Sequence, residues 1–170
     1  TFTMTERRKF EVVKESGNFE IRKYSPCVMA SVVVDADFEQ SGNIGFRPLV
    51  SYISKNQIAM TAPVIQEERG AQSWQVSFVM PDGVQLKDLA QSSSVTLAAV
   101  PEQVAAVVRF SGVTRWAKVE QEGAKLREFI EREGLQAVGA FQIARFDPPW
   151  KPGFMRYNEI VQVVNGMKIR

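Results

Sequence analysis

"VMASVVVD", Val28–Asp35, is a run of mostly β-branched and small apolar residues that fits a largely buried strand. A similar run, "VAAVVRFS", occupies Val104–Ser111. Each run is followed by a helical pattern and then by two further strand patterns, so the sequence predicts two strand–helix–strand–strand repeats. Two such βαββ units are expected to pair their strands into one antiparallel sheet or open barrel with both helices against it, an α+β fold.

The first helix is predicted over Phe46–Lys55, with Pro48 in its first turn, where the missing N–H costs nothing. Its apolar stripe follows helical spacing and comprises Phe46, Leu49, Val50 and Ile53. The preceding segment, Phe38–Gly45, contains two glycines and an asparagine, and is therefore interpreted as a loop.

The second helix is predicted over about Thr114–Glu133, and Gly134 is its expected stop. Helical spacing predicts that one face of this helix is buried against the sheet. That face comprises Trp116, Val119, Leu126 and Ile130.

A β-hairpin is predicted before the first repeat. Its strands, Phe10–Glu15 and Phe19–Tyr24, flank the turn residues Ser16-Gly17-Asn18. Along the second of these strands one face is mostly apolar and the other is polar. Further strands are expected near Ile58–Glu68, Trp74–Pro81, Ala140–Phe146 and Tyr157–Val164.

The chain has 170 residues, 45% of them hydrophobic, so one domain is expected over residues 10–170 after an N-terminal extension, residues 1–9. The formal net charge is only +2, from 21 basic and 19 acidic residues, and this balance argues against nucleic-acid binding. No apolar run reaches the ~18 residues that a membrane-spanning helix needs, so no membrane span is expected.

The opening stretch, "TFTMTERRKF", is charged and lacks the apolar centre of a signal peptide. Because it does not begin with Met, a preceding segment is expected to have been removed, and a signal peptide is one candidate for it. The single cysteine, Cys27, requires no disulfide within the chain, and a cytoplasmic location is expected. The absence of histidine excludes His-based triads, His-liganded zinc and a His-ligated haem iron.

Two motifs are candidates for a binding site. In "NQIAMTAPV", Asn56–Val64, the flexible thioether of Met60 suits the rim of an apolar ligand site. The alternative is a buried strand interrupted at Pro63, which would then lie at an edge or bulge.

The second motif, "RFDPPWKPGFMRYNEI", is Arg145–Ile160. Its prolines fix the backbone, so we interpret it as a rigid corner between two strands, with Trp150 and Phe154 at the surface or over a cleft. A weaker alternative is a proline-rich recognition segment at Pro149–Pro152.

The same motif carries carboxylates. Glu159 and Asp147 are candidates for an acid/base pair. The alternative is an Arg–carboxylate pair that ties the corner together.

The chain closely resembles the SOUL/haem-binding protein family in four segments that occur in the same order: "FEIRKY", "IAMTAPV", "SFVMP" and "RFDPPWKPGFMRYNEI". The resemblance runs from about Phe10 to Val164, and the last segment is its most specific part. It implies a distorted antiparallel β-barrel of two βαββ repeats with two flanking helices. It also implies a non-catalytic protein that binds haem, another tetrapyrrole or an apolar small molecule.

Some members of that family bind the tetrapyrrole in an apolar groove beside the first helix, with basic side chains near the propionates, and others ligate iron through histidine. Without a histidine, this chain is expected to use the first mode and to have no metal site. The resemblance then implies Arg47 as the propionate partner, with Lys55 as a second basic candidate. The implied apolar contacts are Val50, Met60, Trp150, Phe154 and Met155. The remaining candidate iron ligands, which no iron-binding motif places, are Met60, Met155, Tyr52, Tyr157 and Cys27.

Two other function classes stay open. One is a small-molecule-binding or hydrolytic protein of the gyrase-inhibitor-like fold, in which Glu159 or Asp147 would act without a histidine. The other is a protein-interaction module with no small ligand, whose partners the sequence does not specify.

Overall fold

The two strand–helix–strand–strand repeats fall in two compact units of the computed structural model, which describes residues 5–148 and 150–166. The first unit comprises Thr1–Lys9 and Ser25–Glu102, and the second comprises Phe10–Tyr24 and Gln103–Arg170.

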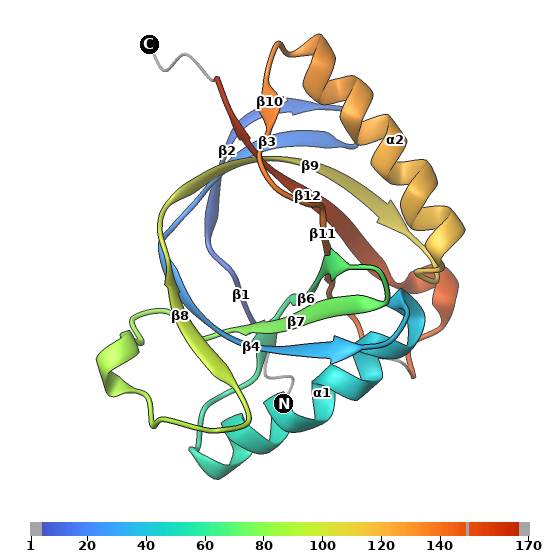
Figure 1. Ribbon diagram of the computed structural model, residues 1–170. Helices are drawn as coiled ribbons and strands as arrows, with labels where there is room; N and C mark the ends of the chain where they lie inside the picture. Colours follow the sequence, from blue (N-terminus) through green and yellow to red (C-terminus); the bar gives the residue numbers. More distant parts are fainter. Residues whose placement is uncertain (1–4, 149, 167–170) are drawn as a thin grey trace. The chain divides into compact units, whose positions relative to one another are not determined.

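The first unit is an antiparallel sheet with one helix. Its strands and helix are β4 (Cys27–Asp35), α1 (Phe38–Lys55), β6 (Val64–Gly70), β7 (Ser73–Val79) and β8 (Thr96–Val100), with a short 3-10 turn, η1 (Leu86–Asp88), before β8. The strand order is β6-β7-β4-β8, and α1 lies against β4 and β7 (Figure 1).

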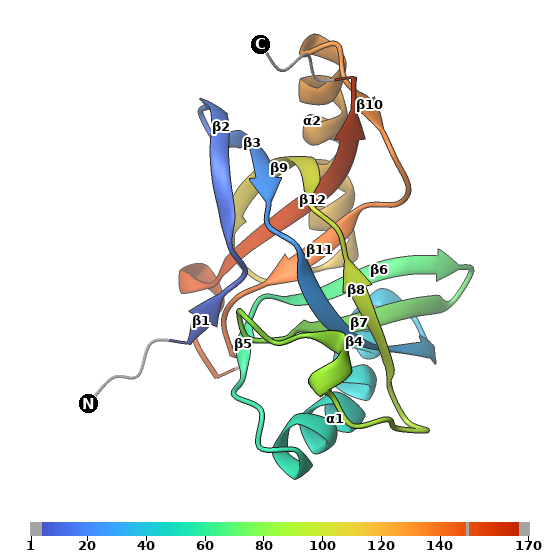
Figure 2. The same ribbon diagram turned by 90° about the vertical axis from the view of Figure 1, so that its left-hand side faces the viewer.

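The second unit repeats this arrangement. Its elements are β2 (Phe10–Ser16), β3 (Phe19–Tyr24), β9 (Gln103–Ser111), α2 (Trp116–Arg132), β10 (Gln136–Ala137), β11 (Gln142–Arg145), η2 (Gly153–Met155) and β12 (Tyr157–Asn165). The strand order β11-β12-β9-β3 matches β6-β7-β4-β8 of the first unit, with β2 added outside β3 and β10 paired with β12. Figure 2 shows α2 beside β9 and β12. The α+β class, the antiparallel repeats and the two helices are thereby confirmed.

One short pair of strands departs from the antiparallel pattern. β1 (Glu6–Arg7) pairs in parallel with β5 (Thr61–Ala62), and the next residue continues the contact, since Arg8 N donates to Ala62 O over 2.9 Å. Residues 5–9 are thus attached to the first unit through backbone hydrogen bonds.

α1 begins at Phe38 rather than at Phe46, so the interpretation of Phe38–Gly45 as a loop was wrong. Asp37 caps the helix by accepting a hydrogen bond from Gln40 N over 2.8 Å. Gly45 serves close packing, because a Cβ added to it would lie 2.6 Å from Val76 Cγ2. Pro48 therefore lies inside the helix and not in its first turn.

α2 agrees with its predicted bounds to within two residues. Val119, Leu126 and Ile130 are buried as predicted, but Trp116, at the first turn of the helix, is 38% exposed, and its predicted burial was wrong. Phe129, which the predicted stripe omitted, is buried and stacks on Phe19 with ring centroids 4.7 Å apart.

None of the helices in the described residues is long and apolar enough to cross a membrane.

Candidate functional site

One flank of α1 combines apolar side chains with a guanidinium. Arg47 is exposed on the outward face of the helix, and Val50, one turn further on, is half-buried. Phe46, which lies one turn before Val50, remains 41% exposed although its ring meets Phe78 edge-on at a centroid distance of 5.3 Å. This flank therefore offers two apolar side chains, Phe46 and Val50, and one cation, Arg47.

Met60 lies in the segment between α1 and β5 and is half-buried. Val50, Ile58 and Met60 all pack against the same core cluster of the first unit, which includes Leu49 and Phe78. The structure therefore brings two predicted contact residues, Val50 and Met60, onto one apolar cluster. The strand predicted over this stretch is interrupted at Pro63, which separates β5 from β6.

A groove of about 540 Å³ runs along another side of α1. Its volume falls within the range of roughly 300–1,000 Å³ typical of small-molecule sites. The lining is largely polar and comprises Pro48, Ser51, Tyr52, Lys55, Asn56 and residues 90–94. Lys55 thus belongs to this groove, whereas Arg47 does not line it.

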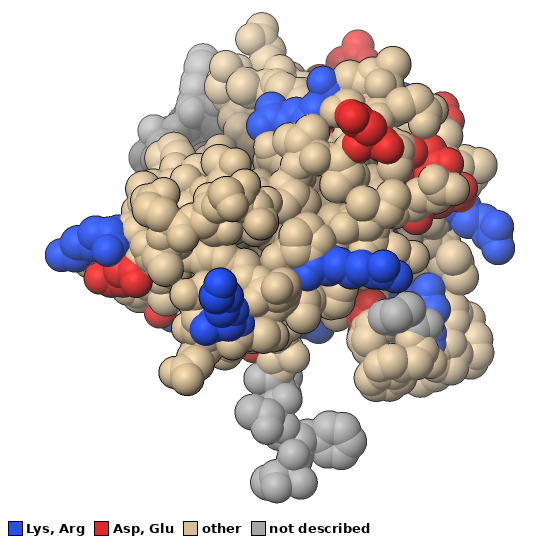
Figure 3. Space-filling model, turned by 60° about the horizontal axis from the view of Figure 1, so that its bottom comes forward, with Lys and Arg blue, Asp and Glu red and all other residues tan. Residues whose placement is uncertain are grey.

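The face brought forward in Figure 3 is mostly uncharged. Its Lys and Arg side chains stand apart from one another and do not form a continuous basic patch on this face. A single cation beside apolar surface is the arrangement that α1 provides around Arg47.

The motif Arg145–Ile160 forms the connection between β11 and β12, as predicted for a corner. Its apolar side chains face solvent: Trp150 is 82%, Phe154 81% and Met155 53% exposed. Pro149 lies outside the described residues. These three side chains therefore give the corner an exposed apolar surface within the second unit.

Hydrogen bonds hold the corner in shape. Asp147 accepts from Lys151 Nζ over 2.9 Å and from Tyr157 N over 2.5 Å, and Arg156 Nε donates to Lys151 O over 2.8 Å. Asp147 is therefore paired with a lysine and a backbone amide, and both contacts tie the corner together.

A buried ionic network joins residues of β3 and β12. Arg22 donates to both carboxylate oxygens of Glu159, over 2.8 and 2.7 Å, and its Nε donates to Glu20 over 2.7 Å. The guanidinium also donates to Tyr24 Oη over 2.9 Å and lies 4.0 Å from the centroid of the Phe10 ring. Arg22, Glu20 and Glu159 are each at least nine-tenths buried.

This network occupies both carboxylate oxygens of Glu159. Both of its oxygens accept from Arg22, and one also accepts from Tyr157 Oη. The carboxylate is therefore satisfied within the protein, and its arrangement favours a structural role over that of a general base. Sequence reasoning missed Arg22 and Glu20, although a polar face on a strand flanked by apolar residues is a signal that could have found them.

The phenols and the thiol that are candidate iron ligands are held in their protonated forms. Burial raises the pKa of Tyr52, whose hydroxyl donates to Ala90 O over 2.7 Å. Burial, followed by the charge of Glu159, raises the pKa of Tyr157. Burial also raises the pKa of Cys27, although Arg8 acts in the opposite direction. Cysteine and tyrosine ligate iron as thiolate and phenolate, so a raised pKa makes these three residues poorer ligands.

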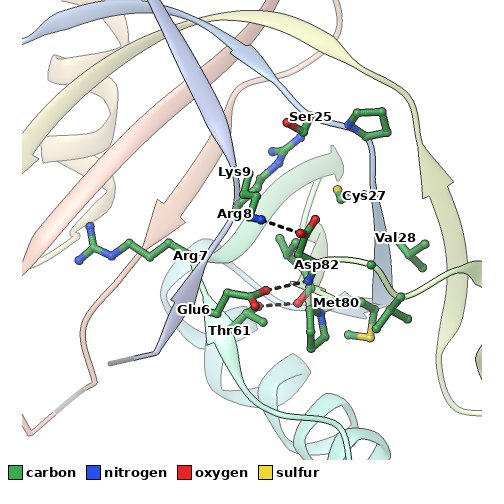
Figure 4. Close-up of a pocket in the computed structure, with 15 residues that line it drawn as sticks. Glu6, Arg7, Arg8, Lys9, Ser25, Cys27, Val28, Thr61, Met80 and Asp82 are labelled. Atoms are coloured by element: carbon green, nitrogen blue, oxygen red, sulfur yellow. Dashed lines mark hydrogen bonds and ion pairs between the residues drawn. The ribbon is translucent and has the colours of Figure 1, made fainter. Parts of the chain in front are cut away.

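Cys27 borders a small pocket of the first unit, shown in Figure 4. Glu6 and Lys9 converge on Asp82, with hydrogen bonds of 2.8 and 2.6 Å, whereas the Arg7 side chain extends away from them. The pocket has a volume of about 40 Å³, which is too small for a tetrapyrrole.

Within the described residues, no group of three or more Cys, Asp and Glu side chains is arranged to hold a metal ion. In the first unit, the flank of α1 offers apolar surface beside the guanidinium of Arg47. In the second unit, the corner between β11 and β12 offers exposed apolar side chains. The candidate iron ligands are thioethers or groups whose pKa is raised, so these residues do not fit an anchored haem iron.

The SOUL heme-binding protein family model matches residues 5–163 of the chain. A search of curated protein sequences found no match to this chain.

Several solved structures are similar. The crystal structure of the EcmrR C-terminal domain is 13% identical, with a TM-score of 0.71 over 88% of this chain and 98% of that chain. A hydrolase from Listeria innocua is 15% identical, with a TM-score of 0.59 over 90% and 94% of the two chains. SAV2435 bound to tetraphenylphosphonium is 10% identical, with a TM-score of 0.57 over 87% and 94%. At these identities the likeness establishes the fold alone.

Proposed function

Because the chain belongs to the SOUL heme-binding protein family, we propose that it binds a tetrapyrrole reversibly and without catalysis. The observation that supports this most is the flank of α1 on which Arg47 stands beside the partly exposed side chains of Phe46 and Val50. A tetrapyrrole presents the matching chemistry, because it is a flat apolar ring system that carries carboxylates at its edge.

Apolar contact provides most of the affinity in this proposal. Val50 and Met60 are half-buried on the core of the first unit, so each keeps apolar surface that a ring can cover. In the second unit, Trp150, Phe154 and Met155 offer further apolar surface. For Val50 and Met60 we propose a contact with the macrocycle, and for Arg47 an ion pair with a propionate. For Trp150, Phe154 and Met155, a contact with the macrocycle is what the family resemblance implies.

The iron contributes little to binding in this proposal. The chain has no histidine, and burial keeps Tyr52, Tyr157 and Cys27 protonated. The thioethers of Met60 and Met155 are the remaining candidates, and a neutral thioether is a weak anchor by itself. Metal-free protoporphyrin should therefore bind nearly as well as haemin.

Titration with haemin and with protoporphyrin IX, followed by absorbance and tryptophan fluorescence, tests the proposal. We expect saturable binding at one site, with dissociation constants that differ by less than about tenfold, or ~1.4 kcal/mol. A hundredfold preference for haemin would show that iron is ligated. Absence of binding by both porphyrins would leave the family relationship as a statement about fold.

A hydrolytic function is the second candidate, since a hydrolase from Listeria innocua shares the fold. Glu159 is the buried carboxylate that such a mechanism would use, but Arg22 and Tyr157 already occupy both of its oxygens. That pairing supports binding over hydrolysis. Turnover of ester substrates that is lost in Glu159→Gln, with folding retained, would reverse this preference.

A further inference from the structure

A second groove, of about 500 Å³, lies in the second unit between α2 and the turn of the β2–β3 hairpin. The end of β9 forms its third wall. The lining includes Ser16, Gly17, Asn18, Phe19, residues 108–111, Lys118, Glu122, Lys125 and Arg132. None of the residues proposed to contact the tetrapyrrole lines this groove, so it is a separate feature of the molecule.

Basic side chains line the helical wall of the groove at regular spacing. Lys118, Lys125 and Arg132 are seven residues apart, which places them on one face of α2 at intervals of about 10 Å. Lys118 and Lys125 both approach Glu122 Oε1, at 3.2 and 3.3 Å. Their ammonium groups are therefore close enough for one anion to contact both.

The charges of the groove do not cancel. Glu122 offsets only one of its two lysines, and among the described residues Arg132 has no ion-pair partner. Arg109, on the opposite wall, is matched by Glu15 and Glu20, at 3.4 and 3.2 Å. The groove thus keeps an excess of about two positive charges, and because Lys118 and Lys125 are 39% and 52% exposed they remain accessible to a ligand.

The floor of the groove is apolar. Val108 and Phe110 are buried there, and Phe19 is half-buried with its ring stacked on Phe129. A ligand that fits must therefore combine a group of high negative charge with an apolar body.

We propose that this groove binds a small organic phosphate monoester. Its phosphate lies between Lys118 and Lys125, and its apolar part lies over Phe19. A phosphate monoester carries about −1.5 to −2 charge at pH 7, which matches the excess of the groove better than one carboxylate does. Lysine ammonium groups bind phosphate as point charges, which suits two flexible side chains that converge on one position.

Glu122 has a specific role in this proposal. Its carboxylate holds the two lysines at the groove, but it competes with the phosphate for their charge. Glu122→Gln should therefore strengthen phosphate binding, whereas Lys118→Ala with Lys125→Ala should weaken it. A role for Glu122 in stability alone predicts no gain in affinity.

The test is a calorimetric titration of the full chain with 1-naphthyl phosphate, with 1-naphthol and inorganic phosphate as comparisons. We expect saturable binding of 1-naphthyl phosphate, at least tenfold tighter than that of either fragment. Lys118→Ala/Lys125→Ala should lose at least tenfold in affinity, and Glu122→Gln should gain several-fold. Absence of saturable binding, or binding equal to that of inorganic phosphate, would overturn the proposal.

Arg127→Ala is the matched control, because Arg127 lies on the opposite face of α2, with its guanidinium 5.1 Å from the centroid of the Phe141 ring. It should leave the affinity unchanged, and circular dichroism should show that all variants are folded. An equal loss in Arg127→Ala and in the double variant would contradict the assignment. So would amide chemical-shift changes on α1 and not on α2. None of these outcomes depends on porphyrin binding, so this proposal and the tetrapyrrole proposal can fail separately.

Discussion

Arg22 and Glu159 lie 137 positions apart in the sequence, yet their side chains form a two-point ion pair with N–O distances of 2.8 and 2.7 Å. β3 and β12 carry the two residues and do not pair with each other, because β9 lies between them. Ala105 is the register partner of Arg22 on β9, and its small side chain leaves room for the guanidinium to cross that strand. The ion pair therefore links three strands of the second unit.

Replacing Arg22 by Met should destabilise the protein by ~3–5 kcal/mol, because Glu20 and Glu159 would remain as buried carboxylates without their cation. Denaturant unfolding measures the change in the free energy of unfolding. Lys14→Ala is the control, since the exposed pair of Lys14 with Glu133 should contribute less than ~1 kcal/mol. Equal losses in the two variants would show that the buried network has no special role in stability.

The stability of the protein should fall as the pH rises above about 10, the ordinary pKa of tyrosine. Burial raises the pKa of Tyr157, so above that pH the folded chain keeps a proton that the unfolded chain has lost. The contribution is therefore complete below pH ~10 and is lost as the pH rises towards the pKa of the folded state. The free energy of unfolding should be measured between about pH 9 and 11, which is ~1 unit either side of that ordinary pKa. Over this range it should decline less steeply for Tyr157→Phe than for the native chain. Parallel declines would refute this account.

Leu126→Ala should destabilise the protein by ~2–5 kcal/mol, because the Leu126 side chain lies on the buried face of α2 and is completely buried. Trp116→Ala should cost less despite the larger side chain, since Trp116 is 38% exposed. Urea unfolding of the two variants gives the comparison. A larger loss of stability at Trp116 would mean that this side chain contributes more to packing than its exposed fraction indicates.

Gly45→Ala should destabilise the protein by ~1–3 kcal/mol although alanine favours helices, because its Cβ would overlap Val76 Cγ2 at 2.6 Å. Asn43→Ala, at an exposed position of the same helix, should be neutral or slightly stabilising. Thermal unfolding of both variants separates packing from helix propensity. A stabilising Gly45→Ala would show that α1 can move away from β7 at little cost.

Arg47→Ala should weaken porphyrin binding only ~2–5-fold, because an ion pair at an exposed position is worth ~0.5–1 kcal/mol. Met60→Ala and Trp150→Ala should each weaken it by more than tenfold, since apolar contact provides most of the affinity in our proposal. Fluorescence titrations with protoporphyrin IX measure these ratios. Lys87→Ala, at an exposed position of η1, serves as the control. The reverse ranking would mean that charge, and not apolar contact, dominates.

The local patterns were predictable wherever one face of an element meets the core. Leu126 and the β2–β3 hairpin followed from spacing and turn residues alone. The first turns of α1 were missed because Gly42 and Gly45 suggest a loop, whereas Gly45 lets the helix approach β7. Close approach of two backbones is a tertiary requirement that no local propensity contains.

The candidate site was less accessible to sequence reasoning. The apolar contacts of Val50 and Met60 were predicted from the family resemblance, and their place on one core cluster appears only in the structure. The pairing of Arg22 with Glu159 depends on two strands that no local pattern connects. The lysines of the α2 groove are visible in the sequence, but the opposing wall comes from a hairpin almost one hundred residues earlier.

The interleaving of the two units has a consequence for synthesis on the ribosome. The β2–β3 hairpin emerges before any of the first unit's sheet, but its partner strand, β9, follows about 80 residues later, or roughly 4–16 s at the usual speed of translation. A two-stranded hairpin is at best marginally stable in water. Because Glu159 belongs to the last strand, the ion pair of Arg22 with Glu159 can form only after β12 has been made.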